Sequence, residues 1–241
     1  MPKLEKYEKT LDYSYALGLF PCMEALNKAP QLVKRVILCS DISSEALRTI
    51  ENAAQKYNIR LEYADKLIKT ISQKQNCFAA AVFEKKEPEL DAKKNHIVLH
   101  NISDKGNLGT ILRSALGFGF LDIAIISPAC DKFDPQVIRA SMGAMFSMRV
   151  RDFSSFEEYE SGYKNRAFYP LMLDSSRDIG SVSKDSPTPF SLILGNEGSG
   201  LPSKFKHIGQ AVIIPHSRDI DSLNLSIAAS IAMYLFAKYN K

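Results

Sequence analysis

The sequence predicts an α/β protein with a mostly parallel sheet and helices on both faces. Short apolar runs of strand length alternate with longer segments of helical spacing along most of the 241 residues. Loops rich in Gly, Asn and Ser follow several of these runs. Hydrophobic residues make up 45% and charged residues 24% of the chain. This composition is ordinary for a globular protein, and a chain of this length can bury a core without disulfide or metal staples.

The first part of the chain, residues 1–84, shows a compact α/β pattern. Pro21 can open a helix through ALNKA, because proline is favoured in the first helical turn. Asp41 and Ser43 are two candidate N-caps for the next helix. Strands are expected at VKRVILC (33–39), NIRLEYA (58–64) and CFAAAVFE (77–84). Helices are expected over SEALRTIENAAQKY (44–57) and ADKLIKTIS (64–72).

The stretch EKKEPELDAKKN is almost wholly charged and contains a proline, which predicts a linker. We therefore expect a first domain over 1–84, a linker over 85–95 and a second domain over 96–241. Strands of the second domain are expected at HIVLHN (96–101), DIAIIS (122–127), RAFYPLMLD (166–174), FSLILG (190–195) and AVIIP (211–215). Helices are expected over NLGTILRSALGFG (107–119), DPQVIRASMGAMF (134–146), SFEEYESGY (155–163) and SLNLSIAASIAMYLFAKY (222–239).

Charge and cysteine usage set bounds on partners and compartment. The net charge of +4 permits an anionic partner without requiring one, since the basic residues are spread along the chain. The four cysteines form no CxxC and have no neighbouring His cluster, which argues against a zinc site and fits a reducing compartment. The N-terminus lacks a signal-peptide core, and no apolar run has the length of a membrane span. We expect a cytoplasmic protein.

Three loops follow expected strands: NISDKGNLGT (101–110), GNEGSGL (195–201) and PHSRDIDSLN (215–224). Ligands of open α/β sheets bind beyond the carboxyl ends of strands, so these loops are candidate site segments. GNEGSGL is neither a P-loop, which needs GK[ST], nor a dinucleotide fingerprint, which opens a long helix. Its three glycines could adopt positive φ and let the backbone approach a ligand, while Glu197 could hold the loop amides. An ordinary turn with an exposed glutamate fits equally well.

The other two loops lead into helices. Asn107 is the candidate N-cap of the helix that carries Arg113, and Gly109 permits close packing at its start. Arg113 is either a surface residue whose stem covers apolar neighbours or a fork of donors for a phosphate or ribose. Ser222 and Asn224 precede the last helix, with Ser222 the expected cap, and both are either simple caps or site residues.

The three loops taken together are a more specific signal of function than any one of them alone. N-x-G-x-x-x-R-x-A, L-G-N-E-G-x-G-L and I-P-x(6)-S-L-N-x-S occur in this order. They resemble the three signature motifs of the SpoU family of RNA ribose methyltransferases, within the SPOUT superfamily. RASMGAMFSMRV (139–150) also resembles a family segment, and the resemblance covers about residues 96–239. On GLFPCMEAL and QNCFAAAVF, the first half is similar to small α/β substrate-binding domains related to kink-turn-binding ribosomal proteins.

The resemblance implies a trefoil knot near the C-terminus, S-adenosylmethionine bound in the knotted loops, no metal, and a homodimer with its active site at the interface. It implies methyl transfer to a ribose 2′-hydroxyl of rRNA or tRNA. The catalytic set it implies is Arg113, Asn107, Glu197, Ser222 and Asn224. The cofactor set it implies is Leu194, Gly195, Asn196, Gly198, Ile214, Pro215, Ser222, Leu223 and Asn224. Arg113 would act as a base or orient the ribose and stabilise the oxyanion; its ordinary pKa above about 12 makes it a poor base.

Two departures from the family pattern keep alternatives open. Arg218 and Asp219 stand where glycine is common, and Lys105 stands where proline is common. The alternatives are a non-catalytic RNA-binding protein that retains the fold, and a SPOUT enzyme that methylates a base. A nucleotide-binding oxidoreductase is disfavoured because the dinucleotide fingerprint is absent.

Overall fold

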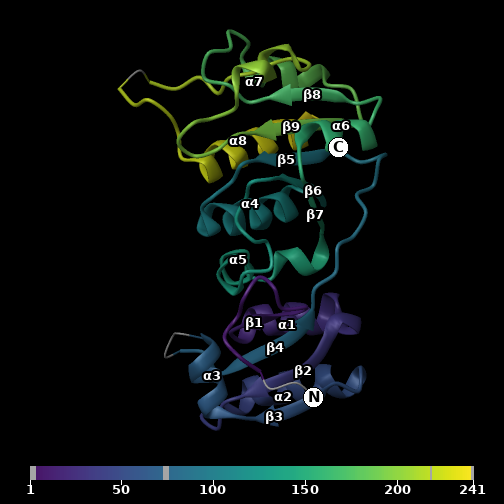
Figure 1. Ribbon diagram of the computed structural model, residues 1–241, viewed down its shortest axis with the longest axis vertical. Helices are drawn as coiled ribbons and strands as arrows, with labels where there is room; N and C mark the ends of the chain where they lie inside the picture. The colour runs from purple at the N-terminus through teal and green to yellow at the C-terminus, as the bar shows by residue number, and fades with distance from the viewer. Residues whose placement is uncertain (1–3, 73–75, 218, 240–241) are drawn as a thin grey trace. The chain divides into compact units, whose positions relative to one another are not determined.

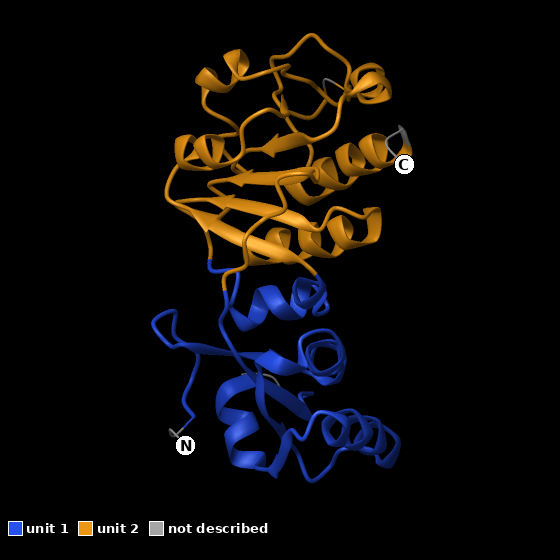
Figure 2. Ribbon diagram, turned by 90° about the vertical axis from the view of Figure 1, so that its right-hand side faces the viewer, with its two compact units in different colours: residues 1–86, 131–147 blue, residues 87–130, 148–241 orange. Residues whose placement is uncertain are grey.

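The computed structural model describes residues 4–72, 76–217 and 219–239. Its contacts group the chain into two compact units (Figure 2). The first unit contains Met1–Lys86 and Asp131–Ser147, and the second contains Glu87–Cys130 and Met148–Lys241. The chain therefore passes between the units three times. Residues 131–147, expected inside a continuous second domain, pack with the first unit: Ser14 Oγ donates to the Phe133 carbonyl at 2.5 Å.

The first unit is built on a four-stranded mixed sheet in the order β1 (Tyr13–Leu17), β4 (Ala79–Glu84), β2 (Val33–Leu38), β3 (Arg60–Tyr63). β4 runs antiparallel to β1 and β2, while β2 and β3 are parallel. Its helices are α1 (Leu19–Lys28), α2 (Ser44–Lys56), α3 (Asp65–Ser72) and α5 (Pro135–Ala140). Ser43, and not Asp41, caps α2. β1 was not expected.

The second unit confirms the expected parallel sheet. Its five strands lie in the order β7 (Arg149–Phe153), β6 (Asp122–Ile126), β5 (His96–His100), β9 (Phe190–Leu194), β8 (Ala167–Pro170), and every pair is parallel. His96 pairs with Asp122 and with Ser191, and Asp122 pairs with Arg149. The amino ends of four strands are therefore in register at one edge of the sheet, and their carboxyl ends lie at the other.

Helices cover both faces of this sheet (Figure 1). α4 (Lys105–Phe118) and α8 (Leu225–Tyr239) pack against one another, with Ser230 Oγ donating to Ser114 Oγ at 2.9 Å. The ring of Phe236 on α8 lies 4.8 Å from the ring of Phe190 on β9. On the opposite face, α6 (Phe156–Gly162) buries aromatic rings against alternate residues of the strands. A short helix, α7 (Ile179–Val182), follows β8.

Several expected elements end or begin elsewhere, and the last helix starts at Leu225 and not at Ser222. RAFYPLMLD is a strand only to Pro170, and AVIIP is no strand: Val212 and Ile213 form single bridges to residues 171 and 178. The helix expected over 134–146 ends at Ala140 because Met142 and Gly143 adopt positive φ, and a 3-10 turn (Ala144–Ser147) follows. α4 starts at Lys105, and β7 was not expected. Further 3-10 turns span Pro30–Leu32, Ser183–Asp185 and Ser203–His207.

Candidate active site

The glycine loop after β9 is closed by its own hydrogen bonds. The amide of Asn196 donates to the Gly200 carbonyl at 3.2 Å, and the amide of Gly200 returns a hydrogen bond at 3.0 Å. Asn196 Oδ1 accepts from the amides of Gly198 and Ser199 at 2.9 and 3.1 Å. Its Nδ2 donates to the Asn101 carbonyl at 2.8 Å, which joins this loop to the end of β5.

The three glycines of this loop have different structural roles. A Cβ on Gly195 would lie 2.3 Å from the carbonyl carbon of Gly200, so only glycine allows the two sides of the loop to meet. Of the three glycines, Gly200 alone has a positive φ, at 66°. A Cβ on Gly198 would meet only Asn196 Oδ1, at 3.6 Å. The expectation that all three adopt positive φ is therefore wrong. The tightest steric constraint is at Gly195, where a Cβ would meet the opposite side of the same loop.

Glu197 ties the glycine loop to the loop after β5. Its Oε2 accepts from the amide and hydroxyl of Ser103, at 3.3 and 3.0 Å, and from Asn196 Nδ2 at 3.2 Å. Its Oε1 accepts from the amide of Asp104 at 3.1 Å and from Asn107 Nδ2 at 3.4 Å. Burial opposes ionisation, but hydrogen bonds from the amides of Glu197, Asp104 and Ser103 outweigh it, so the pKa of Glu197 is lowered.

The first and third loops meet through two asparagines. Asn224 Nδ2 donates to Asn107 Oδ1 at 3.2 Å. Asn107 is not the cap of α4, because Asp104 takes that place and accepts from the Asn107 amide at 2.6 Å. Asn224 Oδ1 accepts from the amides of Ser226 and Ile227, at 2.9 and 3.3 Å, so Asn224 and not Ser222 caps α8. A continuous hydrogen-bond network thus links all three expected site segments.

A pocket lies beside this network. Its cavity volume is about 110 Å³, and it is partly open to solvent. Eight of the expected site residues line it: Leu194, Gly195, Asn196, Glu197, Gly198, Ile214, Ser222 and Leu223. Pro215, Asn224, Asn107 and Arg113 are not among its lining residues. Glu197 is its only charged lining residue among the described positions.

Arg113 lies on the exposed side of α4. Within the described parts of the chain, no hydrogen bond or ion pair engages its guanidinium. It lies six residues beyond Asn107, which is about 9 Å along a helix. Arg218 lies outside the described residues, and Asp219 contacts Ser217 through two hydrogen bonds.

The sequence reasoning missed two groups of site residues. Ser103 and Asp104 bind Glu197, although nothing in their spacing distinguishes them from a polar turn. The other group lines the pocket: Leu171, Met172, Leu173, Ile213, His216, Leu225 and Ala228. The apolar run that continues past the end of β8 was the available signal for residues 171–173, since a strand that ends early leaves apolar side chains at the carboxyl edge.

Two classes of site are not found in residues 4–72, 76–217 and 219–239. No group of three or more His, Cys, Asp or Glu side chains is placed to hold a metal ion. No helix there has the length and apolar character needed to cross a bilayer. The four cysteines are free thiols.

Comparison with known proteins agrees with this geometry. The model of the SpoU rRNA Methylase family matches residues 94–234. Ribosomal RNA small subunit methyltransferase G 2 of Syntrophobacter fumaroxidans is 33% identical over 141 residues, which are 58% of this chain and 27% of that relative. The Bacillus subtilis 23S rRNA (guanosine(2553)-2′-O)-methyltransferase RlmP is 23% identical, with 95% of this chain and 90% of the relative covered.

Among solved structures, the AdoMet-bound rRNA methyltransferase from Sinorhizobium meliloti has the same fold, with a TM-score of 0.79 and 24% identity. The match covers 95% of this chain and 88% of that one. The family match spans more than half of the chain and includes all three loops that the hydrogen-bond network joins. This chain therefore belongs to the SpoU rRNA methylase family.

Proposed function

We infer that this protein transfers a methyl group from S-adenosylmethionine to a ribose 2′-hydroxyl of rRNA or tRNA. The observation that carries the inference is the hydrogen-bond network in which Glu197 and two asparagines join the three family segments beside one pocket. Relatives of similar length support it by name, since one is a 23S rRNA 2′-O-methyltransferase.

The pocket suits the cofactor. Its walls are mostly aliphatic, from residues such as Leu171, Ile213 and Leu223, and can take a purine ring. Its single charge among the described lining residues is the Glu197 carboxylate, and no Lys or Arg stands among them. Such a site disfavours nucleotide phosphates and suits a ligand that carries positive charge. When bound, S-adenosylmethionine supplies an activated methyl group, so the chain's own task is binding and alignment.

The side chains divide that task. Both oxygens of Glu197 are occupied by donors, so we assign it to holding the loops and not to removing a proton. Asn107 and Asn224 fix the starts of α4 and α8 relative to the glycine loop. Arg113 is the remaining candidate to orient the ribose and stabilise its developing oxyanion. Its exposed position fits a site completed by a second copy of the chain.

A homodimer is the assembly we propose, with α4 and α8 in the interface. Ile227 and Tyr234, seven residues apart on α8, are 52% and 50% exposed. The ring of Phe118 on α4 lies 6.0 Å from that of Tyr234, so the apolar surface extends across both helices. We also propose the trefoil knot that is typical of the family. The return of residues 212–213 to bridge residues 171 and 178 supports this path.

The first unit is the proposed RNA-binding unit, of the type related to kink-turn-binding ribosomal proteins. Its sequence has 16 Lys and Arg against 12 Asp and Glu, while the second unit has 15 of each. The whole positive excess of the chain therefore belongs to the unit without the pocket. Lys and Arg supply the phosphate contacts that dominate RNA affinity. An rRNA or tRNA substrate would place the protein in the cytoplasm.

A methyl-transfer assay tests the proposed function. The full chain is incubated with methyl-labelled S-adenosylmethionine and undermethylated total RNA, beside Arg113→Ala. The control is Lys184→Ala, at an exposed cation of the same unit that lies outside the three loops and the lining of the pocket. Label recovered as 2′-O-methylnucleoside, lost in Arg113→Ala and kept in the control, is the expected result. Label on a base, or cofactor binding with no transfer to any RNA, would refute it.

A further inference from the structure

The second unit has a buried polar cluster far from the pocket, at the amino edge of the sheet. His96, Asp122 and Ser191 lie at the starts of β5, β6 and β9 and are 0% exposed, and Arg166 just before β8 is 9% exposed. The glycine loop follows the carboxyl end of β9, so the length of the sheet separates the cluster from the pocket. Buried ionisable groups are costly unless they are paired, so this cluster needs an explanation of its own.

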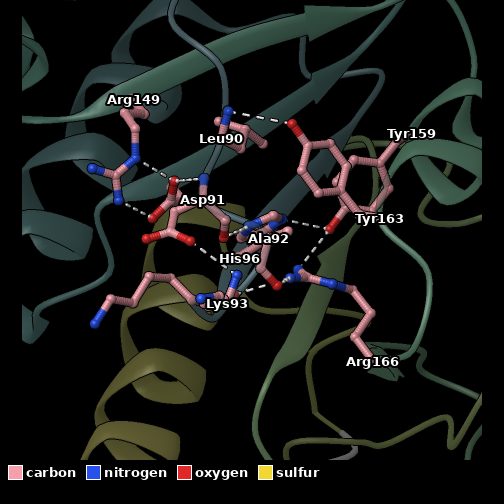
Figure 3. Close-up of polar contacts among 11 residues, drawn as sticks. Leu90, Asp91, Ala92, Lys93, His96, Arg149, Tyr159, Tyr163 and Arg166 are labelled. Atoms are coloured by element: carbon pink, nitrogen blue, oxygen red, sulfur yellow. Dashed lines mark hydrogen bonds and ion pairs between the residues drawn. The ribbon is translucent and has the colours of Figure 1, made fainter.

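The partners of the cluster are backbone atoms of residues 90–94 (Figure 3). Asp122 Oδ1 accepts from the Asp91 amide at 2.8 Å, and the Asp91 carbonyl accepts from His96 Nε2 at 2.9 Å. Arg166 Nη2 donates to the carbonyls of Ala92 and Lys94, at 3.0 Å each. A further side chain, Tyr163 at the C-cap of α6, accepts from the Leu90 amide at 3.2 Å.

The hydrogen bonds within the cluster fix its protonation pattern. A carbonyl only accepts, so His96 Nε2 carries a proton, and Nδ1 accepts from the hydroxyl of Tyr159 at 2.9 Å. Tyr159 accepts in turn from Arg166 Nη1 at 3.1 Å and is hydrogen-bonded to Ser191 at 2.7 Å. Arg166 thus directs its charge to neutral oxygens, two of them backbone carbonyls of the segment. The cluster is complementary to a bound stretch of peptide.

Asp122 also contacts a residue that lies just after another point where the chain passes from one unit to the other. Arg149 follows the passage at residues 147–148 and donates to both oxygens of Asp122, from Nε and Nη2, at 2.6 Å each. The chain enters the second unit at residues 86–87 and again at 147–148. A few residues after each of these points, the chain contacts the Asp122 carboxylate. A charged linker exposed to solvent would not require such contacts with a buried carboxylate.

We propose that the cluster is an intramolecular binding site for residues 90–94, an anchor that fixes where the RNA-binding unit is attached. This role rests on the proposed function, but the anchor itself does not. In the first unit, the Lys85 amide is held by the Asp12 carbonyl at 2.9 Å; in the second, Glu89 pairs with Arg151. Only residues 86–88 lie between these contacts. Fully extended, three residues reach at most about 10 Å, against roughly 33 Å for ten residues if 86–95 were released.

The anchor predicts a sharp difference in backbone protection along a few residues. In hydrogen exchange on the full chain, the amides of Leu90 and Asp91 should exchange at least ten times more slowly than those of Lys86 and Glu87. Limited trypsin digestion should cut after Lys86 well before Lys93 or Lys94. Equal exchange rates, or equal cleavage, would overturn the anchor whether or not the protein methylates RNA.

Variants then test what the anchor does. Tyr163→Phe removes only the hydroxyl that accepts from Leu90, and should speed exchange of that amide about tenfold, the loss of one hydrogen bond. Tyr169→Phe, at a buried tyrosine whose hydroxyl has no partner among the described residues, is the matched control. Arg166→Met should release residues 92–94 and open the Lys93 and Lys94 sites to trypsin.

The functional readout separates anchoring from catalysis. In both Tyr163→Phe and Arg166→Met, the KM for RNA should rise several-fold, while kcat and the Kd for S-adenosylmethionine stay within twofold of wild type. A fall in kcat or in cofactor affinity, with residues 90–94 still protected, would assign the cluster to the integrity of the active site. Faster exchange with an unchanged KM for RNA would overturn the proposed role in substrate binding.

Discussion

Replacing His96 by glutamine should remove an acid-sensitive element from the second unit. His96 is fully buried at the start of β5, and its two ring nitrogens contact the Asp91 carbonyl and the Tyr159 hydroxyl. Burial, reinforced by the positive charge of Arg166, lowers the pKa of His96 from 6.5 to about 4. Glutamine can donate to the same carbonyl and accept from the same hydroxyl, but it does not titrate.

The sign and size of the effect follow from proton linkage. Between pH 6.5 and 4 the unfolded chain binds a proton at this histidine that the folded chain does not, so stability falls as the pH falls. Above pH 6.5 the contribution is complete. At pH 5 the free energy of unfolding of the wild type should be lower by about 2 kcal/mol on account of His96 alone, against less than about 0.1 kcal/mol at pH 7.5.

The measurement is urea unfolding of wild type and His96→Gln at pH 7.5 and pH 5. Other titrating groups contribute equally to both proteins, so they cancel in the difference. Whatever the offset at pH 7.5, the variant should gain about 2 kcal/mol relative to wild type at pH 5. His207→Gln, at an exposed histidine of the same unit, is the control. A difference that stays constant between the two pH values would show that burial does not hold His96 neutral.

Three other outcomes are expected. Gly195→Ala places a Cβ 2.3 Å from a backbone carbon, so calorimetry should show at least tenfold weaker S-adenosylmethionine binding, whereas Gly198→Ala should bind as wild type does. Asn224→Asp keeps the α8 cap but loses its donor to Asn107, so the Tm should hold while kcat falls; Asn224→Ala should also cost about 1 kcal/mol of stability. Tyr159→Phe leaves the buried His96 Nδ1 without its partner, while Arg166 Nη1 and Ser191 Oγ keep their contact with each other, and should lower the free energy of unfolding by about 1–3 kcal/mol in denaturant titration.

The sequence predicted those features of the structure that depend on the spacing of apolar side chains or on the order of the motifs. The strands that begin at His96 and Asp122 contain unbroken apolar runs because the sheet buries them on both faces. The order of the three motifs also indicated that distant loops converge, and the contacts of Glu197 and Asn224 confirm that convergence. Neither result depends on knowing how the chain passes from one unit to the other.

Other features depend on partners that a local pattern does not contain. AVIIP has the composition of a strand, yet Val212 and Ile213 meet only isolated bridge partners. Asp104 caps α4 instead of Asn107 because the cap is decided by where the preceding loop turns, and Glu197 holds that loop from 93 residues away. Residues 84–95 have the charge and proline of a linker, but backbone atoms carry the contacts of 90–94, and sequence composition does not register backbone contacts.

The site itself sets a limit on the role of its glutamate. Five donors surround the Glu197 carboxylate, and each comes from a segment that must be in place before the pocket has its shape. Removing the carboxylate would leave the amides of Ser103 and Asp104 without their acceptor, so the loop before α4 would move together with the helix that carries Arg113. A loss of activity in a Glu197 variant would therefore report lost alignment. Glu197→Gln keeps one acceptor oxygen and nearly the same volume but replaces the other oxygen by a donor, so it separates the charge of the carboxylate from its role in shaping the loops. Retained cofactor binding with slower methyl transfer would indicate that the charge matters. Loss of both binding and transfer would indicate that the shape of the loops matters.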